Sequence, residues 1–435
     1  VQELQVQELL LGSTPSEQSV RVHERCDTPV EFLVRPQWFL RVLEYKPQLL
    51  QAAEQIDWRP EHMKARYVQW VENLGWDWCL SRQRAFGVPF PAWHCARCGE
   101  IILAEREALP LDPTASTPPR SCTRGNSELA PDVDVMDTWA TSSLTPQIAG
   151  RWLSDPELYE QVFPMSTRPQ AHDIIRTWAF YTIVKSLYHF DQVPWKRVDI
   201  SGWGIAGEGM GKISKSRGGG PAAPMAMIER HSADALRYWA ASTGPGKDAV
   251  ISEPKIQMGT KLVNKLWNVA RFSQRFLLEY RPADKLPALS TADRWILART
   301  QALVERVTGS MRSSEYAAAK SEVEGFFWTE LADNYLEMAK LRLYDETHPA
   351  RAGARYTLYH VLLVTLKLLA IFVPHVTERI YLELYAKGEG EPSIHVLPWP
   401  APDPRWRDEA WEQAGEALVA IATAVMLFGL SSGAA

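Results

Sequence analysis

Hydrophobic positions follow a helical repeat through most of the second half of the chain. After about residue 255, apolar residues recur three and four positions apart in five runs: 261–278, 291–311, 315–344, 354–373 and 375–386. This spacing places apolar side chains on one face of an α-helix, so the pattern predicts an all-α helical bundle. The most apolar run, Val361–Val373, contains Lys367 and stops at Pro374. It is too short for a membrane span, and we expect a buried helix.

The first half of the chain has a mixed, α/β pattern. Val30–Val34 alternates like a strand, and residues 38–55 and 61–74 predict amphipathic helices. Further on, the pattern predicts a strand entering a turn over 133–143, a helix over 173–189 and a short buried strand over 198–200 that runs into Ser201–Gly204. A strand that feeds a glycine turn at the carboxyl edge of an α/β sheet is the usual position of a ligand crevice. The fold class we predict is therefore an α/β domain followed by a helical bundle.

Composition narrows this picture only a little. A chain of 435 residues predicts two or three domains, and 46% hydrophobic with 23% charged residues is typical of an ordinary soluble protein. The net charge of −5 means that a nucleic-acid partner would need a local basic face. Five cysteines without a signal peptide favour a reducing, cytoplasmic location. Both ends of the sequence look cut, so we expect a piece of a longer protein.

The strongest chemical signal is Lys212-Ile213-Ser214-Lys215-Ser216, which is followed by Gly218–Gly220. Lys212 and Lys215 offer cations to the charge that develops on a polyphosphate, while Ser214 and Ser216 add hydroxyl donors. The glycines permit the loop to close. A solvated charged turn is the commoner explanation of such a pentapeptide by itself.

Two further clusters of polar residues are candidates for substrate binding. His172 and Asp173 stand near a predicted helix start with Gln170 close by, and a carboxylate there can hold an ammonium group or a ribose hydroxyl. A helix cap for Asp173 and a core position for His172 are the alternatives. Arg82, Gln83 and Arg84 could contact phosphates or an RNA end, or could simply be surface charge.

Three cysteines have a spacing that suggests a metal knuckle. Cys95 and Cys98 form a CxxC pair, and Cys122 follows after a long gap. Gly125 stands where a second pair would be completed, which leaves His94 as a local candidate for the fourth ligand. We expect a degenerate knuckle rather than a complete zinc site.

Taken in order, the motifs resemble the valyl-tRNA synthetase family of class I aminoacyl-tRNA synthetases, in its archaeal-type branch. The resemblance runs from about Val22 to Trp411. It rests on five segments with agreeing order and spacing: Trp78–Gln83, Asp134–Trp139 with Ser142-Ser143, Arg168–Trp178, the KMSKS-like Lys212–Ser216, and Lys261–Phe272. The substrates and partners that this implies are ATP with Mg²⁺, valine and valine tRNA.

The resemblance also implies roles for the candidate residues. Lys215 with Lys212 would bind ATP phosphates, Gly202, Trp203 and Gly204 would lie along the adenosine, and Asp173 would hold the amino group of the amino acid. Residues 1–35 would be the return from an inserted editing domain, and residues 36–255, with the cysteine knuckle at about 93–125, the second half of a Rossmann-type catalytic domain. Residues 256–435 would be a helical stem and anticodon-binding bundle, truncated at its end.

One family motif is absent from the sequence. The family's first half carries a His-x-Gly-His pair that binds ATP across the crevice, and no two of the ten histidines form that pattern. We therefore expect that catalysis needs a missing amino-terminal half, for example one supplied in trans. A non-catalytic tRNA-binding paralogue and an isoleucine-specific synthetase stay open as alternatives.

Overall fold

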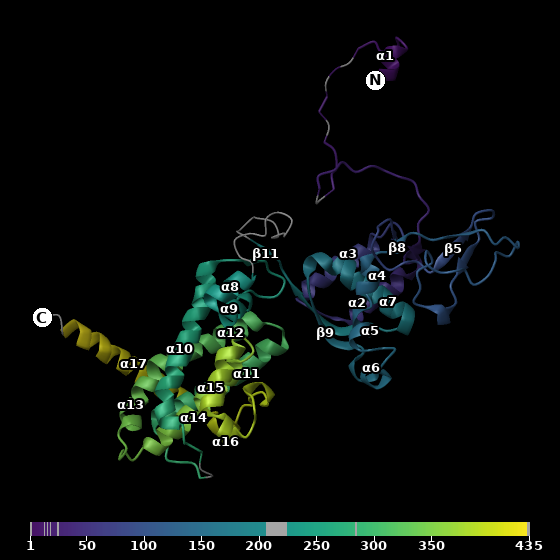
Figure 1. Cartoon of the computed structure of the whole chain (residues 1–435). Coiled ribbons are helices and arrows are strands. Elements are labelled where there is room, and N and C mark those ends of the chain that lie inside the picture. Colours follow the sequence, from purple (N-terminus) through teal and green to yellow (C-terminus); the bar gives the residue numbers. More distant parts are fainter. Residues whose placement is uncertain are drawn as a thin grey trace. The chain divides into compact units, whose positions relative to one another are not determined.

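The computed structural model describes residues 2–12, 14, 16–17, 19–23, 26–205, 224–282 and 285–432 (Figure 1). Backbone contacts group the chain into two units. Unit 1 consists of Val1–Leu40, Trp78–Ala85 and Pro89–Val135, and unit 2 of Arg41–Asp77, Phe86–Val88 and Met136–Ala435. Each unit is described by itself.

Unit 1 is built around a small antiparallel sheet. Its strands β5 (Ala92–Cys95), β6 (Ile101–Leu103) and β7 (Leu129–Pro131) pair in the order β6-β5-β7. Trp93 of β5 lies opposite Ile102 and Pro131, and both Trp93 and Ile102 are fully buried. A second pairing joins β1 (Phe39–Leu40) to β3 (Trp78–Cys79). The strand predicted over Val30–Val34 is wrong: this segment has no strand partner among the described residues, and Phe32 and Val34 are exposed.

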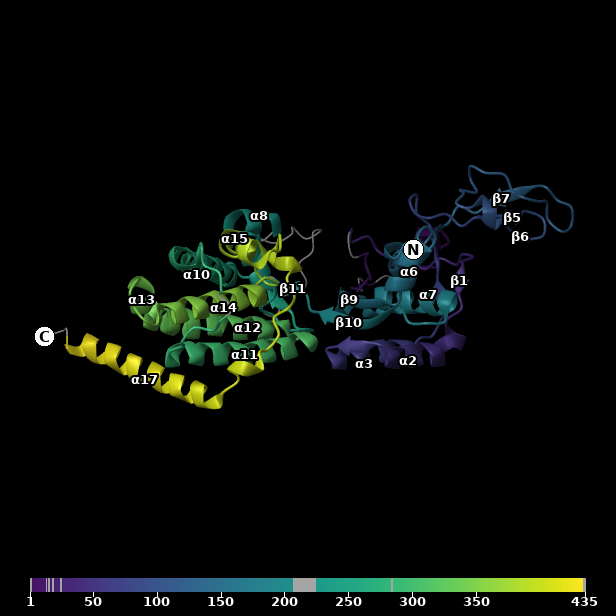
Figure 2. The same ribbon diagram turned by 90° about the horizontal axis from the view of Figure 1, so that it is seen from below.

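The α/β part of unit 2 contains a parallel sheet of three strands. β2 (Asp57–Arg59), β10 (Trp195–Ser201) and β9 (Met165–Ala171) lie in the order β2-β10-β9. The helices α2 (Lys46–Gln55) and α3 (Lys64–Glu72) cover one face of the sheet (Figure 2). Trp58 of β2 packs against Tyr67 of α3 with ring centroids 5.5 Å apart, and both side chains are buried. Parallel strands buried by helices in this way place their carboxyl ends along one edge.

The segment that leads out of β9 begins with a 3₁₀ turn, η4 (His172–Ile174). A short π-helix, η5 (Ile175–Ala179), follows and leads into α7 (Phe180–Phe190). Beyond β10, the two-residue strand β11 (Gly204–Ile205) pairs in parallel with β12 (Ala249–Val250). The helices α8 (Pro224–His231) and α9 (Ala233–Ala240) lie between these strands in the sequence.

The remaining helices form the predicted bundle around one hydrophobic cluster. They are α10 (Glu253–Leu277), α11 (Thr291–Arg312), α12 (Tyr316–Gly325), the π-helix η7 (Phe326–Tyr335), α13 (Leu336–Tyr344), α14 (Arg351–Leu369), α15 (Pro374–Leu384) and α17 (Glu409–Ser432). Figure 2 shows α11, α12 and α14 side by side. Most of the apolar run 361–373 is buried, with Ile371 exposed, and no helix in the described part of the chain is long and apolar enough to span a membrane.

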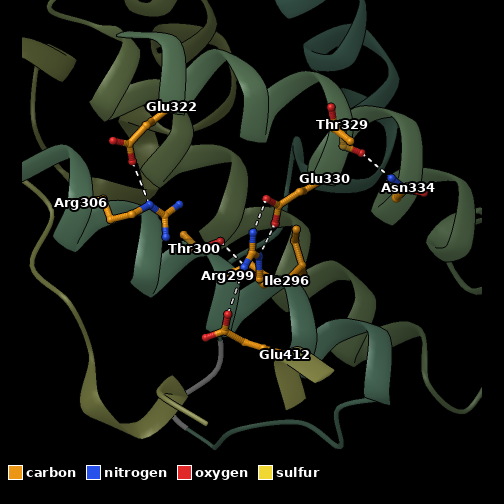
Figure 3. Close-up of polar contacts among 9 residues, drawn as sticks. All are labelled: Ile296, Arg299, Thr300, Arg306, Glu322, Thr329, Glu330, Asn334 and Glu412. Carbon is orange, nitrogen blue, oxygen red and sulfur yellow. Dashed lines mark hydrogen bonds and ion pairs between the residues drawn. The ribbon is translucent and has the colours of Figure 1, made fainter. Parts of the chain in front are cut away.

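Buried and partly buried charges join the bundle helices. Asp293 of α11 is fully buried and accepts hydrogen bonds from the hydroxyl of Tyr335 (2.8 Å) and the guanidinium of Arg342 (2.6 Å). Arg299 lies between two carboxylates, as Figure 3 shows: its Nε and Nη2 each donate to Glu330 at 2.8 Å, and its Nη1 donates to Glu412 of α17 at 3.1 Å. The helix α17 packs closely against α11, since a Cβ on Gly415 would lie 1.9 Å from the ring of Trp295.

Candidate active site

A cavity lined largely by polar and aromatic side chains lies at the carboxyl edge of the α/β sheet, entirely within unit 2. It has a volume of about 440 Å³ and is lined by Arg66, Gln69, Trp70, His172, Asp173, Arg176 and Trp203. His172 and Asp173 directly follow β9, and Trp203 lies two residues beyond the end of β10. The pairing of Ala171 with Ser201 brings these two strand ends together. The position agrees with the ligand crevice predicted from the strand that runs into Ser201–Gly204.

The turn that follows β9 directs some of its side chains into the cavity and others into the hydrophobic core. Within η4 and η5, Ile175 and Ala179 are fully buried, whereas Asp173 and Arg176 line the cavity. Asp173 belongs to the 3₁₀ turn η4, and Arg176 belongs to the π-helix η5. A π-helical turn is rare and often occurs at functional sites.

His172 is held from two sides by charged residues that are distant in the sequence. Its Nδ1 lies 3.2 Å from Arg66 Nη1, and its Nε2 lies 3.4 Å from Asp248 Oδ1. Since a guanidinium can only donate, Nδ1 must accept and Nε2 must carry the proton. The imidazole ring also packs on Trp203, with 4.7 Å between ring centroids. The alternative of a core histidine does not describe this residue, because its ring forms part of the cavity wall.

Asp248 connects this histidine to the backbone beyond β10. Its Oδ1 also accepts the N–H of Trp203 at 2.8 Å. That hydrogen bond, followed by contacts with His172 and Arg66, lowers the pKa of the Asp248 carboxyl below its ordinary value. The turn at Gly202 is closely packed here, because a Cβ would lie 2.2 Å from the carbonyl oxygen of Lys247. Glycine is therefore required at the approach of the 202–204 segment to residues 247–248.

The predicted phosphate-binding residues lie outside the part of the chain that the structure describes. Lys212, Ser214, Lys215 and Ser216 belong to the segment 206–223. Gly202, Trp203 and Gly204 are described, and Trp203 lines the cavity. The three residues of this turn thus bring the chain from β10 past the pocket immediately before that segment begins.

Gln170 does not line the cavity. Its side chain is buried in the sheet, and its Nε2 donates a long hydrogen bond of 3.5 Å to the carbonyl of Ala171. Its neighbour Arg168 is also buried. The guanidinium of Arg168 lies 3.1 Å from the ring centroid of Trp178 and 4.6 Å from that of Trp195. Burial lowers the pKa of Arg168 to about 9.

Sequence patterns did not identify Arg66, Gln69, Trp70 and Asp248 as pocket residues. The first three lie on one face of α3 at spacings of three and four, which is the signal that could have grouped them. Nothing near Asp248 in the sequence points to His172, which lies 76 positions away.

The remaining candidates belong to unit 1. Arg82 donates from Nη1 to the carbonyls of Cys79 and Ser81, each at 2.8 Å, and Gln83 donates to Asp134 at 2.9 Å. Arg84 is exposed. These contacts fix Arg82 and Gln83 locally, whereas Arg84 faces solvent. An acceptor-end contact for this trio stays a prediction.

The three knuckle cysteines meet in unit 1. The sulfur atoms of Cys95, Cys98 and Cys122 lie within 4.8 Å of one another. His94 does not complete the set: neighbouring residues on a strand point to opposite faces, and its Nε2 instead lies 2.9 Å from Asp132. Among the described residues, the cluster therefore offers three thiols rather than the four ligands of a closed structural zinc site.

Two family models match the chain. The family described as "tRNA synthetases class I (I, L, M and V)" matches residues 7–252, and "Anticodon-binding domain of tRNA ligase" matches residues 293–426. The chain belongs to the class I tRNA synthetases.

The curated relatives of this class I synthetase chain include valine–tRNA ligases. The enzyme of Wolbachia pipientis wMel is 42% identical over 95% of this chain and 48% of its own length. That of Methanopyrus kandleri is 44% identical over 94% of this chain and 44% of its own length. The chain thus spans about half the length of the curated relatives it matches.

Solved class I synthetases share the fold at low sequence identity. Methionyl-tRNA synthetase of Mycobacterium tuberculosis, in a structure bound by methionyl-adenylate, matches with a TM-score of 0.61 at 21% identity, covering 88% of this chain and 71% of that chain. A leucyl enzyme of Agrobacterium radiobacter K84 matches with a TM-score of 0.60 at 20% identity, covering 77% and 43%. The predicted fold class, an α/β catalytic part followed by an anticodon-binding bundle, is confirmed.

Proposed function

We propose that this chain supplies the second half of the catalytic domain and the anticodon-binding bundle of a valine–tRNA ligase. The reaction would join valine to ATP as valyl-adenylate, release pyrophosphate, and then transfer valine to its tRNA. The observation that carries the proposal is the identity of 42% and 44% with valine–tRNA ligases over nearly the whole chain. The cytoplasm would be its location.

The cavity at the sheet edge supports an adenylate site. Asp173 offers a carboxylate for the α-ammonium of valine, and the face of Trp203 beside His172 offers a wall for the adenosine. Lys212 and Lys215 would meet the charge on the departing pyrophosphate, with Mg²⁺ on the phosphates of ATP. Donors placed where charge develops are usually the largest catalytic contribution.

The first half of the catalytic domain would have to act together with this chain. Catalysis depends on groups held in one geometry, and a His-x-Gly-His pair is absent from these 435 residues. We therefore propose a partner segment that carries the pair, either supplied in trans or encoded upstream.

Reconstitution tests this proposal. The chain is mixed with the amino-terminal half of a valine–tRNA ligase such as the Methanopyrus kandleri relative, and valine-dependent ATP–pyrophosphate exchange is measured. We expect exchange with valine and a loss of roughly 10²-fold or more in the Lys215→Ala variant, since one transition-state donor is removed.

The matched control is Lys387→Ala, a lysine on the short helix α16 (Ala386–Glu389) of the bundle, which should leave exchange unchanged. Exchange with isoleucine in place of valine would favour the isoleucine enzyme. Binding of valine tRNA without exchange, in every combination of halves, would favour a non-catalytic tRNA-binding paralogue.

A further inference from the structure

The cysteine knuckle of unit 1 consists of two turns with one hydrogen-bonding scheme. In the first turn, the N–H of Cys95 donates to the carbonyl of Glu100 and the N–H of Gly99 donates to the carbonyl of Cys95, each at 2.9 Å. Gly99 has a φ of +72°, in the left-handed region that favours glycine.

The second turn repeats each of these features. The N–H of Cys122 donates to the carbonyl of Asn126 at 3.0 Å, and the N–H of Gly125 donates to the carbonyl of Cys122 at 2.8 Å. Gly125 has a φ of +75°. The matching positions are therefore the first cysteine, the left-handed glycine and the residue that follows this glycine.

Aligning the turns on these features shows which residue is missing from the second. The first reads Cys95-Ala-Arg-Cys98-Gly99-Glu100, and the second reads Cys122-Thr-Arg-Gly125-Asn126. The second turn is one residue shorter, and the position without a counterpart is that of Cys98. The second turn therefore lacks a counterpart of Cys98 because it is one residue shorter, and Gly125 corresponds to Gly99 rather than to a cysteine.

The two turns also hold each other through the residues that follow their glycines. The Glu100 carboxylate accepts the N–H of Thr123 at 2.7 Å and its hydroxyl at 2.6 Å. In the other direction, Asn126 Nδ2 donates to the sulfur of Cys95 and its backbone N–H donates to the sulfur of Cys122, each at 3.3 Å. Such donors favour the thiolate form and orient a sulfur ligand.

We propose that this pair of turns is a three-thiolate site for a thiophilic divalent cation, with a fourth coordination position open to a small exogenous ligand. The sulfurs of Cys95, Cys98 and Cys122 face one another within 4.8 Å, and Cys95 and Cys122 are only 2% and 4% exposed over the buried side chain of Ile102. Asn126 supports the sulfurs from the side where the second turn is shortened. A closed structural site has four protein ligands. A metal held here by three thiolates therefore exchanges more readily than a metal in such a closed site.

Cobalt absorption tests this site without any measurement of aminoacylation. The full chain, reduced and stripped of metal, is titrated with Co²⁺ while thiolate-to-cobalt charge-transfer absorption is recorded. We expect saturation at one Co²⁺ per chain, and a change of the spectrum on addition of imidazole, which enters the open position. Asn126→Ala should weaken binding by roughly 10-fold or more, as losses of outer-shell donors do.

The decisive control inserts one cysteine between Arg124 and Gly125, which restores the length of the first turn. This variant should bind Co²⁺ more tightly than the natural chain by more than the roughly 10–100-fold effect of an outer-shell contact, and imidazole should not change its spectrum. Absence of thiolate absorption in the natural chain would overturn the proposal. So would an affinity equal to that of the insertion variant, because the protein would then already supply a fourth ligand.

Discussion

Asp293 in the helical bundle and Asp248 beside the cavity are both aspartates that accept several hydrogen bonds, but their surroundings differ. Asp293 is fully buried, and a tyrosine, an arginine and the Ser290 cap of α11 surround its carboxylate. Asp248 keeps 41% of its side chain exposed and holds one backbone N–H and one imidazole. The bundle uses charge to fix helices to one another, whereas the sheet edge arranges charge around a space that a ligand can enter.

This contrast predicts that substitutions in the bundle change stability and leave ligand binding intact. The largest effect should come from Asp293→Ala, which leaves Arg342 buried without its carboxylate. Breaking a buried pair in this way costs about 3–5 kcal/mol. Urea unfolding followed by circular dichroism measures the loss. The control is Glu337→Ala, since the Glu337–Lys340 pair is 46% exposed on both sides and should contribute less than about 1 kcal/mol.

A smaller loss is expected for Arg299→Ala, which removes three hydrogen bonds to two carboxylates. These charge-assisted contacts are partly buried, so we expect a loss of about 2 kcal/mol. Arg306→Ala breaks the more exposed pair with Glu322 and serves as the control (Figure 3). Equal unfolding midpoints for the two variants would show that Arg299 does not join α17 to the bundle.

Arg168 provides a test in which stability should rise. No carboxylate is paired with its buried guanidinium in the described ranges, and two of its nitrogens lack a hydrogen-bond partner there. Replacement by methionine fills similar space without the desolvated charge, and we expect a gain of about 1 kcal/mol at pH 7.

The gain should depend on pH in a defined direction. Because the pKa of Arg168 falls to about 9 on folding, the unfolded chain binds more protons above that value, and the natural protein becomes more stable as pH rises through it. The difference between Arg168→Met and the natural chain should therefore shrink between pH 8 and pH 10. A difference that is independent of pH would show that Arg168 is not a desolvated cation.

The smallest effect concerns the cavity. Asp248→Ala removes the acceptor for Trp203 and His172, and we expect a non-hydrolysable valyl-adenylate analogue to bind roughly fivefold more weakly, since one net hydrogen bond is lost. Calorimetry on the reconstituted halves measures this. Unfolding should be nearly unchanged, and Asp248→Asn should recover much of the affinity. An equal loss of stability and affinity would place Asp248 among the purely structural aspartates.

The bundle was predictable because its signal is local. Apolar residues three and four positions apart describe a helix without knowledge of its partners, and the predicted run 291–311 agrees with α11. The predicted helix over 38–55 begins later, at Lys46. The Asp77 carboxylate, more than thirty positions away, accepts the N–H groups of Val42 and Leu43 and holds that part of the backbone in another conformation.

The difference between local and long-range signals also separates the cavity residues that could be predicted from those that could not. His172 and Asp173 could be identified because they lie in one short motif. Arg66 contacts His172 from 106 positions away, and no pattern in the sequence around either residue indicates this contact. Long-range partners of this kind depend on the register of the sheet and helices. A sequence without an alignment of relatives does not supply that register.

Gly415 determines how closely the helix α17 can pack against α11. Only a hydrogen atom fits between its backbone and the ring of Trp295, so α17 can approach α11 at this residue and not at its neighbours with side chains. Glu412 lies almost one turn earlier and reaches Arg299 when this approach is made. The axial position of α17 is thus determined by Gly415, and even an added methyl group there would displace the helix from Trp295.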